Sequence, residues 1–282
     1  MKKKRIKHIR RNVKKMSDIK MLDKNILDRY EQMKLIRYYK NEIHNSGGTL
    51  FNLFLSGSHY YGFPSEDSDF DMRGMYSLDK RYFLGLGKPK NVIQPHHDNI
   101  LYDSEFFELN KYINLVLKGD CNRIEGLHAP HIYYEREYRE LNKILDESWG
   151  KRGLYNSYKG MAFGNYDKFI KKGKNTVKKY LYVYRGLLAG CYALKNGVIQ
   201  ADINVLAKYF RDDNIKALIE MKKEGTEHMA LKSINSGELD EGIQNYFEKL
   251  DVSYDESKLK EKPSEDDWDK VNKWLINHRL GE

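Results

Sequence analysis

The first half of the chain alternates short apolar runs with polar turns, whereas the second half repeats apolar residues at helical spacing. The run Thr49–Leu55 is short and apolar, which predicts a buried strand. Ser68–Tyr76 alternates polar and apolar side chains with a period of two, which predicts a half-buried strand. Gly47 and Gly48 end a helix before the first strand. The predicted elements of this half are a helix over 18–43, strands over 49–55 and 68–76, an extended segment over 92–107 and a helix over 109–118.

From about His131 to the end of the chain, the pattern is helical almost throughout. The clearest stretch is 175–194, where apolar residues recur on one helix face. Because strands come first and helices afterwards, the pattern predicts an α+β fold, and Pro130 marks the boundary between the two parts. We therefore predict a basic tail over 1–17, a domain of strands and helices over 18–130 and a mostly helical domain over 131–282.

The positive charge of the protein is concentrated at its N-terminus. Lys and Arg total 50 against 41 Asp and Glu, which gives a net charge of +9. Residues 1–15 hold nine of the basic residues and no acid, so the other 267 residues carry 41 charges of each sign. The tail is either a solvated extension or an arm that binds nucleic acid.

Composition and spacing exclude several classes of protein. The two cysteines, Cys121 and Cys191, cannot form a disulfide framework, which indicates a reducing compartment, and we expect the cytoplasm. No apolar run approaches the ~20 residues that cross a bilayer, so we expect no membrane partner. The basic N-terminus lacks the apolar stretch of a secretory signal. The sequence has no P-loop, Rossmann or zinc-binding spacing.

The sharpest chemical signal is LSGSHYYGFPSEDSDFDMRG, residues 55–74. The first strand leads into Gly57 and Ser58, whose backbone N–H groups and hydroxyl can bind a phosphate. After a gap of ten residues, Asp69 and Asp71 project from one face of the next strand, close enough to share a divalent metal. Each half alone is common, as a turn or as an ordinary pair of acids. Their conjunction predicts a site for a metal-bound triphosphate.

This motif resembles the signature of the DNA polymerase β-like nucleotidyltransferase superfamily, and its wording is most similar to the RNA-repair-ligase-associated nucleotidyltransferases. The stretches 103–127 and 178–190 also resemble that family, so the resemblance covers about residues 50–195. It implies a small mixed sheet with the active site on one face, followed by a helical domain. The turn at residues 120–122 departs from the Asn-Pro that the family usually has there.

The resemblance also implies a third metal-binding carboxylate on a later strand, and Asp103 is the best match. Glu105 would share the same strand face and could serve instead, and Asp98 is a weaker candidate. The structural alternative for Asp103 is a cap at the start of the next element.

In the chemistry that the family implies, two Mg²⁺ ions, with Mn²⁺ as a substitute, lie between three carboxylates. Asp69 and Asp71 would hold the ion at the nucleotide, and Asp71 with Asp103 would hold the ion at the attacking oxygen. Ser58 and the backbone beside it would hold the phosphates. Arg73, on the strand face of the aspartates, would pair with one of them or with a substrate phosphate, and an acid is the expected partner.

The predicted helix over 175–194 follows a strongly basic stretch. Residues 167–186 hold seven Lys or Arg and one acid. We predict that Lys178 or Lys179, together with Arg185, binds a phosphate of the nucleotide or of RNA. The alternatives are a solvated helix face and, for Arg185, a bridge to an acid between the two domains.

Two other groups say less about function. Glu125 lies at a position that the family shares, where a structural salt bridge is as good an interpretation as a catalytic role. His96 and His97, next to Asp98, do not predict a metal site, because adjacent residues on an extended segment face opposite sides.

These residues and the resemblance predict a nucleotidyltransferase that moves an NMP from an NTP, such as ATP, to a hydroxyl acceptor. The expected acceptor is an RNA 3′ end, with tRNA as the leading candidate, and we expect a functional link to an RNA ligase. The alternatives are transfer to a protein or a small molecule, and a non-catalytic RNA-binding protein on the same scaffold. The intact pair Asp69 and Asp71 argues against the last of these.

Overall fold

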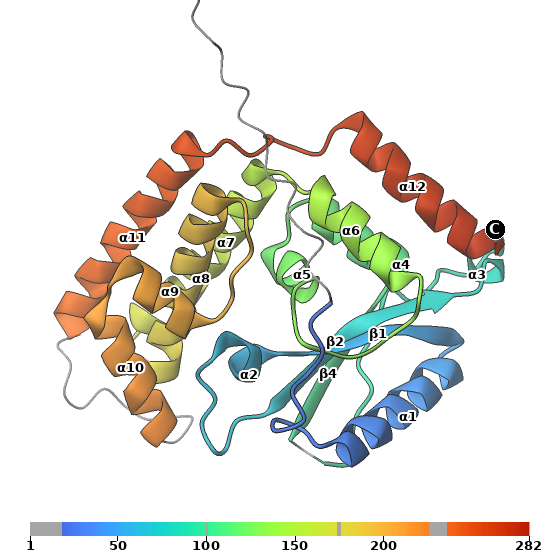
Figure 1. The fold of residues 1–282 in the computed structure, drawn as a ribbon, viewed down its shortest axis with the longest axis horizontal. Coiled ribbons are helices and arrows are strands. Elements are labelled where there is room, and N and C mark those ends of the chain that lie inside the picture. Colours follow the sequence, from blue (N-terminus) through green and yellow to red (C-terminus); the bar gives the residue numbers. More distant parts are fainter. Residues whose placement is uncertain (1–18, 100, 174–175, 226–235, 282) are drawn as a thin grey trace, which may run out of the picture.

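The computed structural model describes residues 19–99, 101–173, 176–225 and 236–281, and within these residues a mixed five-stranded sheet is surrounded by helices (Figure 1). The tail predicted over 1–17 lies outside the described residues. The strands are, in chain order, β1 (Gly48–Ser56), β2 (Phe70–Leu78), β3 (Val92–Ile93), β4 (Tyr102–Glu108) and β5 (His131–Tyr134).

Helices make up most of the remaining described chain, and one turn of π-helix, η1 (Tyr166–Ile170), follows α7 directly. In chain order the helices are α1 (Arg29–Asn45), α2 (Gly57–Tyr61), α3 (Arg81–Leu84), α4 (Leu109–Leu117), α5 (Cys121–Gly126), α6 (Tyr138–Ser148), α7 (Lys151–Asn165), α8 (Val177–Asn196), α9 (Ile203–Phe210), α10 (Asp213–Glu224), α11 (Ser236–Glu256) and α12 (Glu265–Leu280).

The strand order in the sheet is β3-β4-β2-β1-β5. β2 and β4 are parallel, whereas the pairs β1–β2, β1–β5 and β3–β4 are antiparallel. Parallel neighbours need a crossover connection, and here the segment with α3 and β3 supplies it. This arrangement confirms the predicted α+β class with a small mixed sheet.

Different helices cover the two faces of the sheet (Figure 1). On one face, α1 buries Leu35, Tyr39 and Ile43 against apolar side chains of β1, β2 and β4. On the other face, Phe51 and Phe107 belong to a core that includes α4, α5 and α6 and continues into the helical half of the chain. The sheet is therefore fixed from both sides, and its second core is shared with the helices.

The helical half is built around α8, most of whose residues are buried and against which α7, α9, α10 and α11 pack. The last helix, α12, packs against α4 and α6 near the sheet (Figure 1). Its His278 is hydrogen bonded to Ser77 of β2 at 3.0 Å and to Glu137 at 2.7 Å. None of the described helices is long and apolar enough to span a membrane.

The first helix begins later than the predicted residue 18. The side chain of Asp28 accepts a hydrogen bond from the Glu31 N–H and caps α1, which starts at Arg29. Before the cap, the chain runs beside β5: the Leu22 N–H donates to the His131 carbonyl at 2.7 Å, and the His131 N–H donates to the Lys20 carbonyl at 2.8 Å. Backbone pairing at the sheet thus replaces the first helical turns that the apolar spacing predicted.

The expectation of helix from His131 onward is wrong for residues 131–134. These residues form β5, which pairs with β1 at the edge of the sheet. The domain boundary predicted after Pro130 therefore precedes the last strand of the sheet. A four-residue strand is too short to show an alternating pattern, so its position depends on a partner about eighty residues earlier in the chain.

A buried ion pair ties the helical half to α5. The Arg185 side chain on α8 is 1% exposed, and its Nη1 donates to Glu125 Oε1 at 2.7 Å. The Tyr158 hydroxyl on α7 donates to the same oxygen at 2.7 Å, and the Arg185 guanidinium lies 3.8 Å from the centre of the Tyr61 ring. This is the bridge to an acid that the sequence left open as the alternative role of Arg185.

We expect Arg185→Ala to destabilise the protein by about 3–5 kcal/mol, because the variant leaves the Glu125 carboxylate buried without its counter-charge. Denaturant unfolding measures this loss. NTP affinity of the folded fraction, measured below the melting temperature, should stay close to that of the wild type. Normal stability together with lost NTP affinity would contradict the structural role and would indicate that Arg185 binds a phosphate.

The buried His131 makes stability depend on pH. Burial lowers the pKa of His131 from 6.5 to about 4, and the ring is held between Asn52 Nδ2 at 3.1 Å and the Ala129 carbonyl at 2.9 Å. Between pH 6.5 and pH 4, His131 is protonated in the unfolded chain but stays neutral in the folded protein. Stability should therefore fall by about 1.4 kcal/mol for each pH unit between 6.5 and 4, and His131→Gln should remove this part of the slope. Unfolding free energies of both proteins across this range test it, and identical slopes would contradict it.

Candidate active site

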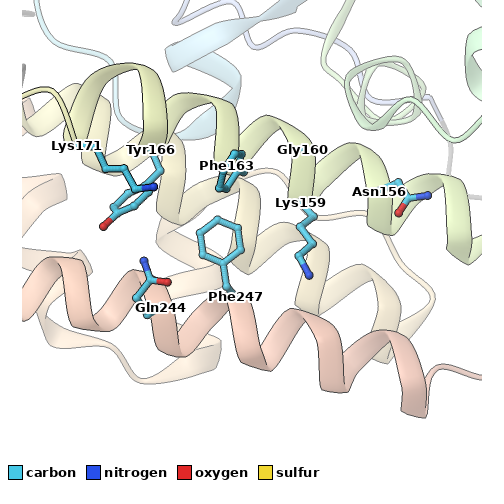
Figure 2. A pocket seen from close by; sticks show the side chains of 8 residues that line it. All are labelled: Asn156, Lys159, Gly160, Phe163, Tyr166, Lys171, Gln244 and Phe247. Carbon is cyan, nitrogen blue, oxygen red and sulfur yellow. The ribbon is translucent and has the colours of Figure 1, made fainter.

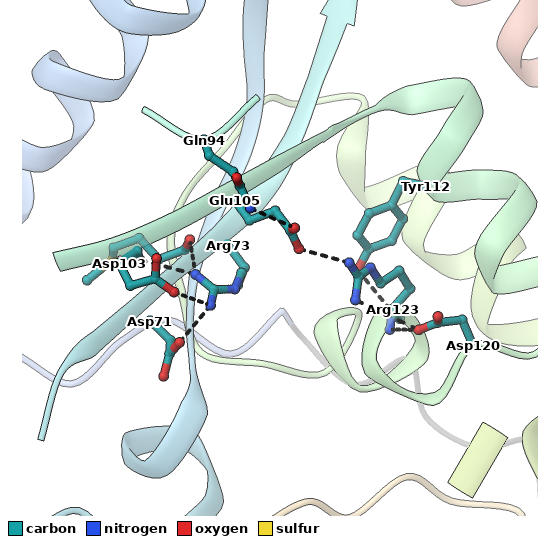
Figure 3. A network of polar contacts seen from close by, with 9 residues as sticks. Asp71, Arg73, Gln94, Asp103, Glu105, Tyr112, Asp120 and Arg123 are labelled. Atoms are coloured by element: carbon teal, nitrogen blue, oxygen red, sulfur yellow. Dashed lines mark hydrogen bonds and ion pairs between the residues drawn. The ribbon is translucent and has the colours of Figure 1, made fainter. Parts of the chain in front are cut away.

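The parallel pairing of β2 and β4 brings two of the predicted carboxylates together. In the register of the two strands, Asp71 lies opposite Asp103, and Arg73 lies opposite Glu105. Figure 3 shows Arg73 in contact with Asp71 and Asp103, and Glu105 on the neighbouring strand in contact with Gln94 and Arg123. Residues far apart in sequence thus meet at the position where the sequence predicted a metal-binding pair.

Arg73 lies between the two aspartates. Its Nη2 donates to Asp71 Oδ1 at 2.6 Å and to Asp103 Oδ2 at 2.7 Å. Its Nη1 donates to the carbonyls of Met72 and Asp103, both at 3.1 Å. The two carboxylates therefore converge on a single cationic nitrogen. Arg73 thus pairs with an acid, as we expected from the sequence.

The Asp71 carboxylate is surrounded by further charges. Burial raises the pKa of Asp71, the carboxylates of Asp103 and Asp69 raise it further, and the positive charges of Arg73 and Lys178 oppose this shift. Asp69 immediately precedes β2 and is exposed. The three predicted carboxylates are thus close enough to sense one another, and a cation placed among them would relieve their repulsion.

Two alternatives to Asp103 are less favourable in the structure. The side chain of Glu105 accepts a hydrogen bond from Arg123 at 3.0 Å and one from Gln94 at 3.2 Å. Asp98 lies close enough to the Tyr38 hydroxyl to raise the pKa of that group, and it has no described contact with Asp71. Asp103 does not cap the next helix, because Glu108 is the cap of α4.

The turn from β1 to α2 fits closely against Asp71. Gly57 has a φ of +63°, and a Cβ at this position would lie 1.7 Å from Asp71 Oδ2. Glycine is therefore required both by the backbone and by the space. Ser58, the next residue, is 5% exposed, so the start of α2 rather than an open hydroxyl faces the carboxylates.

Of the three basic residues predicted on α8, the structure brings Lys178 to the carboxylates. Burial and the neighbouring Lys179 lower the pKa of Lys178, while Asp71, Asp69 and the nearby Asp67 raise it. The ammonium of Lys179 instead lies 3.9 Å from the centre of the Phe169 ring. Arg185 is buried in the core with Glu125, and this burial argues against a role as a phosphate ligand.

A cavity of about 270 Å³ lies beside the aspartates. Its wall includes Arg123, Asn122 and Tyr182, none of which the sequence analysis placed in the site. The available signals were the resemblance over 103–127, which contains Arg123, and the shared helix face of Lys178 and Tyr182. The cavity is lined by Phe54, Ser56, Gly57, Tyr61, Asp71, Arg73, Gly74, Glu105, Phe107, Tyr112, Asn122, Arg123 and Tyr182.

The donor set fits a hard divalent cation that takes part of its coordination from a ligand. Asp71 and Asp103 offer oxygen atoms that already converge on a positive charge, and Asp69 lies within electrostatic reach. Among the described residues, no three His, Cys, Asp or Glu side chains are close enough together to enclose a metal ion by themselves. An ion bound here would therefore need oxygen atoms from water or from a nucleotide's phosphates.

A second cavity, of about 510 Å³, lies between α7, η1 and α11 (Figure 2). Its lining includes the aromatic residues Phe163, Tyr166 and Phe247 and the basic residues Lys159 and Lys171. It contains none of the predicted carboxylates. We therefore assign the candidate active site to the smaller cavity beside Asp71.

Comparisons with known proteins show what the chain is similar to. The chain is 33% identical to YcgL of Bacillus subtilis over 181 residues, which cover 61% of this chain and 69% of YcgL. It is 28% identical to MJ0002 of Methanocaldococcus jannaschii over 228 residues, which cover 75% of this chain and 87% of that protein.

A crystal structure of a nucleotidyltransferase-like protein from Exiguobacterium sibiricum aligns with 89% of this chain and 80% of its own, at 11% identity and a TM-score of 0.31. The sequence profile of the RNA repair pathway DNA polymerase beta family, RlaP, matches residues 27–277. The match spans both halves of the fold and every residue of the candidate site, and the chain belongs to this family.

Proposed function

We propose that this protein is a nucleotidyltransferase that moves an NMP from an NTP to the 3′ hydroxyl of an RNA. The observation that carries the proposal is the convergence of Asp71 and Asp103 on one cationic position beside the start of α2. Membership of an RNA repair polymerase beta family supports the reaction class and the choice of RNA as acceptor.

Asp69, Asp71 and Asp103 would hold Mg²⁺, or Mn²⁺ in its place, together with the phosphates of the nucleotide. When bound, such ions would lower the pKa of the acceptor hydroxyl and offset the charge that develops on the pyrophosphate. The protein's own part is to fix the oxygen atoms. Burial of Asp71 and the register of β2 against β4 support that role, because they hold the carboxylates in place before substrate arrives.

Lys178, at the start of α8, would contact the phosphates, since its charge interacts with those of Asp71 and Asp69. The nucleoside of one substrate would occupy the cavity next to the aspartates, where Tyr182 offers aromatic surface and Arg123, stacked on the Phe107 ring, offers a guanidinium. A volume of about 270 Å³ is at the small end of ligand pockets and suits a single nucleoside.

The RNA acceptor, tRNA in particular, and a link to an RNA ligase rest on the family and on the basic tail, which lies outside the described residues. A cytoplasmic location fits an enzyme with two buried free cysteines, Cys121 and Cys191. Because the RNA acceptor rests on the family and on the tail, it is tested directly by the following experiment.

We expect Asp69→Asn and Asp71→Asn each to reduce NMP transfer by about a hundredfold or more, because each removes a charged oxygen ligand from the reacting centre. The measurement is transfer of label from each α-labelled NTP, with Mg²⁺, to a mixed tRNA pool. Asp79→Asn is the matched control, because Asp79 follows β2 at its other end and pairs with Arg81.

Full activity of either variant would contradict the assignment of the site. Label that appears on the protein or on a small molecule would retain the reaction and overturn the RNA acceptor. RNA binding without any transfer of label would overturn the enzymatic proposal and leave a non-catalytic RNA-binding protein.

Deleting residues 1–15 tests the role of the tail. If the tail contacts RNA, the truncated protein should bind tRNA more weakly, and its affinity should depend less steeply on salt, by about 0.7–0.9 in logarithmic slope for each lost phosphate contact. NTP affinity should stay unchanged, because the candidate site lies elsewhere in the chain. An unchanged salt slope would show that the tail does not bind RNA.

A further inference from the structure

One side chain of the protein already occupies the point on which the two aspartates converge. A single nitrogen, Arg73 Nη2, contacts Asp71 Oδ1 at 2.6 Å and Asp103 Oδ2 at 2.7 Å. Two backbone carbonyls, those of Met72 and Asp103, hold the other terminal nitrogen at 3.1 Å. The guanidinium is therefore fixed by four hydrogen bonds, two of which go to carboxylates.

This contact has a consequence for any divalent cation that needs both carboxylates. A Mg²⁺ ion binds carboxylate oxygen at about 2.0–2.1 Å, so an ion bound to both Asp71 Oδ1 and Asp103 Oδ2 would take the volume that Arg73 Nη2 now fills. Two cations in contact would also repel each other strongly. The ion and the guanidinium therefore cannot occupy the position between the two aspartates at the same time.

The structure offers Arg73 another acid on the same side of the sheet. Glu105 lies directly opposite Arg73 in the β2–β4 register, and its negative charge, after those of Asp71 and Asp103, contributes to the raised pKa of Arg73. Each Glu105 oxygen already accepts one hydrogen bond, from Arg123 or from Gln94, and keeps a second lone pair that Arg73 can use. Both residues line the same cavity. If the Arg73 side chain rotated along this face, its guanidinium would leave the two aspartates and contact Glu105 (Figure 3). The backbone pairing of β2 with β4 would not change.

We propose that Arg73 is a built-in counter-ion that holds Asp71 and Asp103 together in the metal-free protein and turns toward Glu105 when a divalent cation binds. The inference rests on the proposed function, since it concerns the metal of that site. A cation alone binds weakly, because part of its binding energy goes into displacing the guanidinium. A cation that arrives with a triphosphate binds tightly, since the phosphates add oxygen ligands of their own. If Arg73 leaves the aspartates in about one molecule in ten, the apparent affinity for the bare cation is about tenfold weaker than the intrinsic one.

The test measures Mn²⁺ binding to the full-length protein by electron paramagnetic resonance, without nucleotide. Arg73→Gln should bind Mn²⁺ about tenfold or more tightly than the wild type. Its melting temperature without metal should be lower, because the aspartates then repel each other, and Mn²⁺ should raise it more than in the wild type. Lys178→Gln is the matched control: it removes a positive charge near the same carboxylates but not from between them. A field effect alone would tighten binding similarly in both variants and would overturn the displacement.

Glu105→Gln supplies the second measurement and does not depend on the stability of a single variant. In the wild-type background it should weaken Mn²⁺ binding, because the displaced Arg73 loses its new partner. In the Arg73→Gln background it should have no effect, and this coupling distinguishes the two roles of Glu105. An equal loss in both backgrounds would make Glu105 a direct metal ligand and overturn the proposal.

The outcome is separable from that of the proposed function. Unchanged or weaker Mn²⁺ binding by Arg73→Gln, with Asp71→Asn still inactive in NMP transfer, would reject the counter-ion role and keep the nucleotidyltransferase. Tighter Mn²⁺ binding with no transfer to any acceptor would keep the counter-ion role and reject the reaction.

Discussion

The parallel pairing of β2 with β4 is the interaction on which the candidate site depends. It places Asp71 opposite Asp103 on adjacent strands, where two like charges destabilise the pairing unless a cation lies between them. Arg73, two residues along β2, supplies that cation at 2.6 and 2.7 Å. The central strand pair and the geometry of the site therefore have a common origin, and a change in register would remove both.

Helix α5 connects the candidate site to the helical half, because two of its side chains point to opposite sides. Arg123 points into the cavity and pairs with Glu105, whereas Glu125 points into the core and pairs with Arg185 of α8. A buried ion pair is a poor source of net stability, because desolvation of both charges offsets most of their attraction. Its effect here is one of position, because it fixes α8 against α5 in the core.

The sequence predicted the parts of the site that depend on short spacing. Asp69, Asp71 and Gly57 belong to one local motif, and Arg73 shares the strand periodicity of the aspartates, so its acid partner could be anticipated. Asp103 required the family resemblance. The role of Arg185 and the strand β5 depend on partners sixty to eighty residues away, and local periodicity carries no information about such partners. Lys178 and Lys179 are adjacent in sequence, and only the direction of α8 relative to the sheet separates their roles.

Two contacts divide the site into a rigid part and a movable part. The turn at Gly57 fits so closely against Asp71 that even a methyl group would overlap the carboxylate, so β1, α2 and β2 fix one another's positions. Arg73 is held by side-chain charges and by two carbonyls. In the proposed exchange, a divalent cation replaces the contacts with the two aspartates while the sheet stays paired. The proposed exchange would confine reorganisation on binding to this one side chain. The carboxylate framework would then stay preorganised for the charges that develop in the proposed reaction. Fixed groups of this kind stabilise a transition state more than the bound substrate.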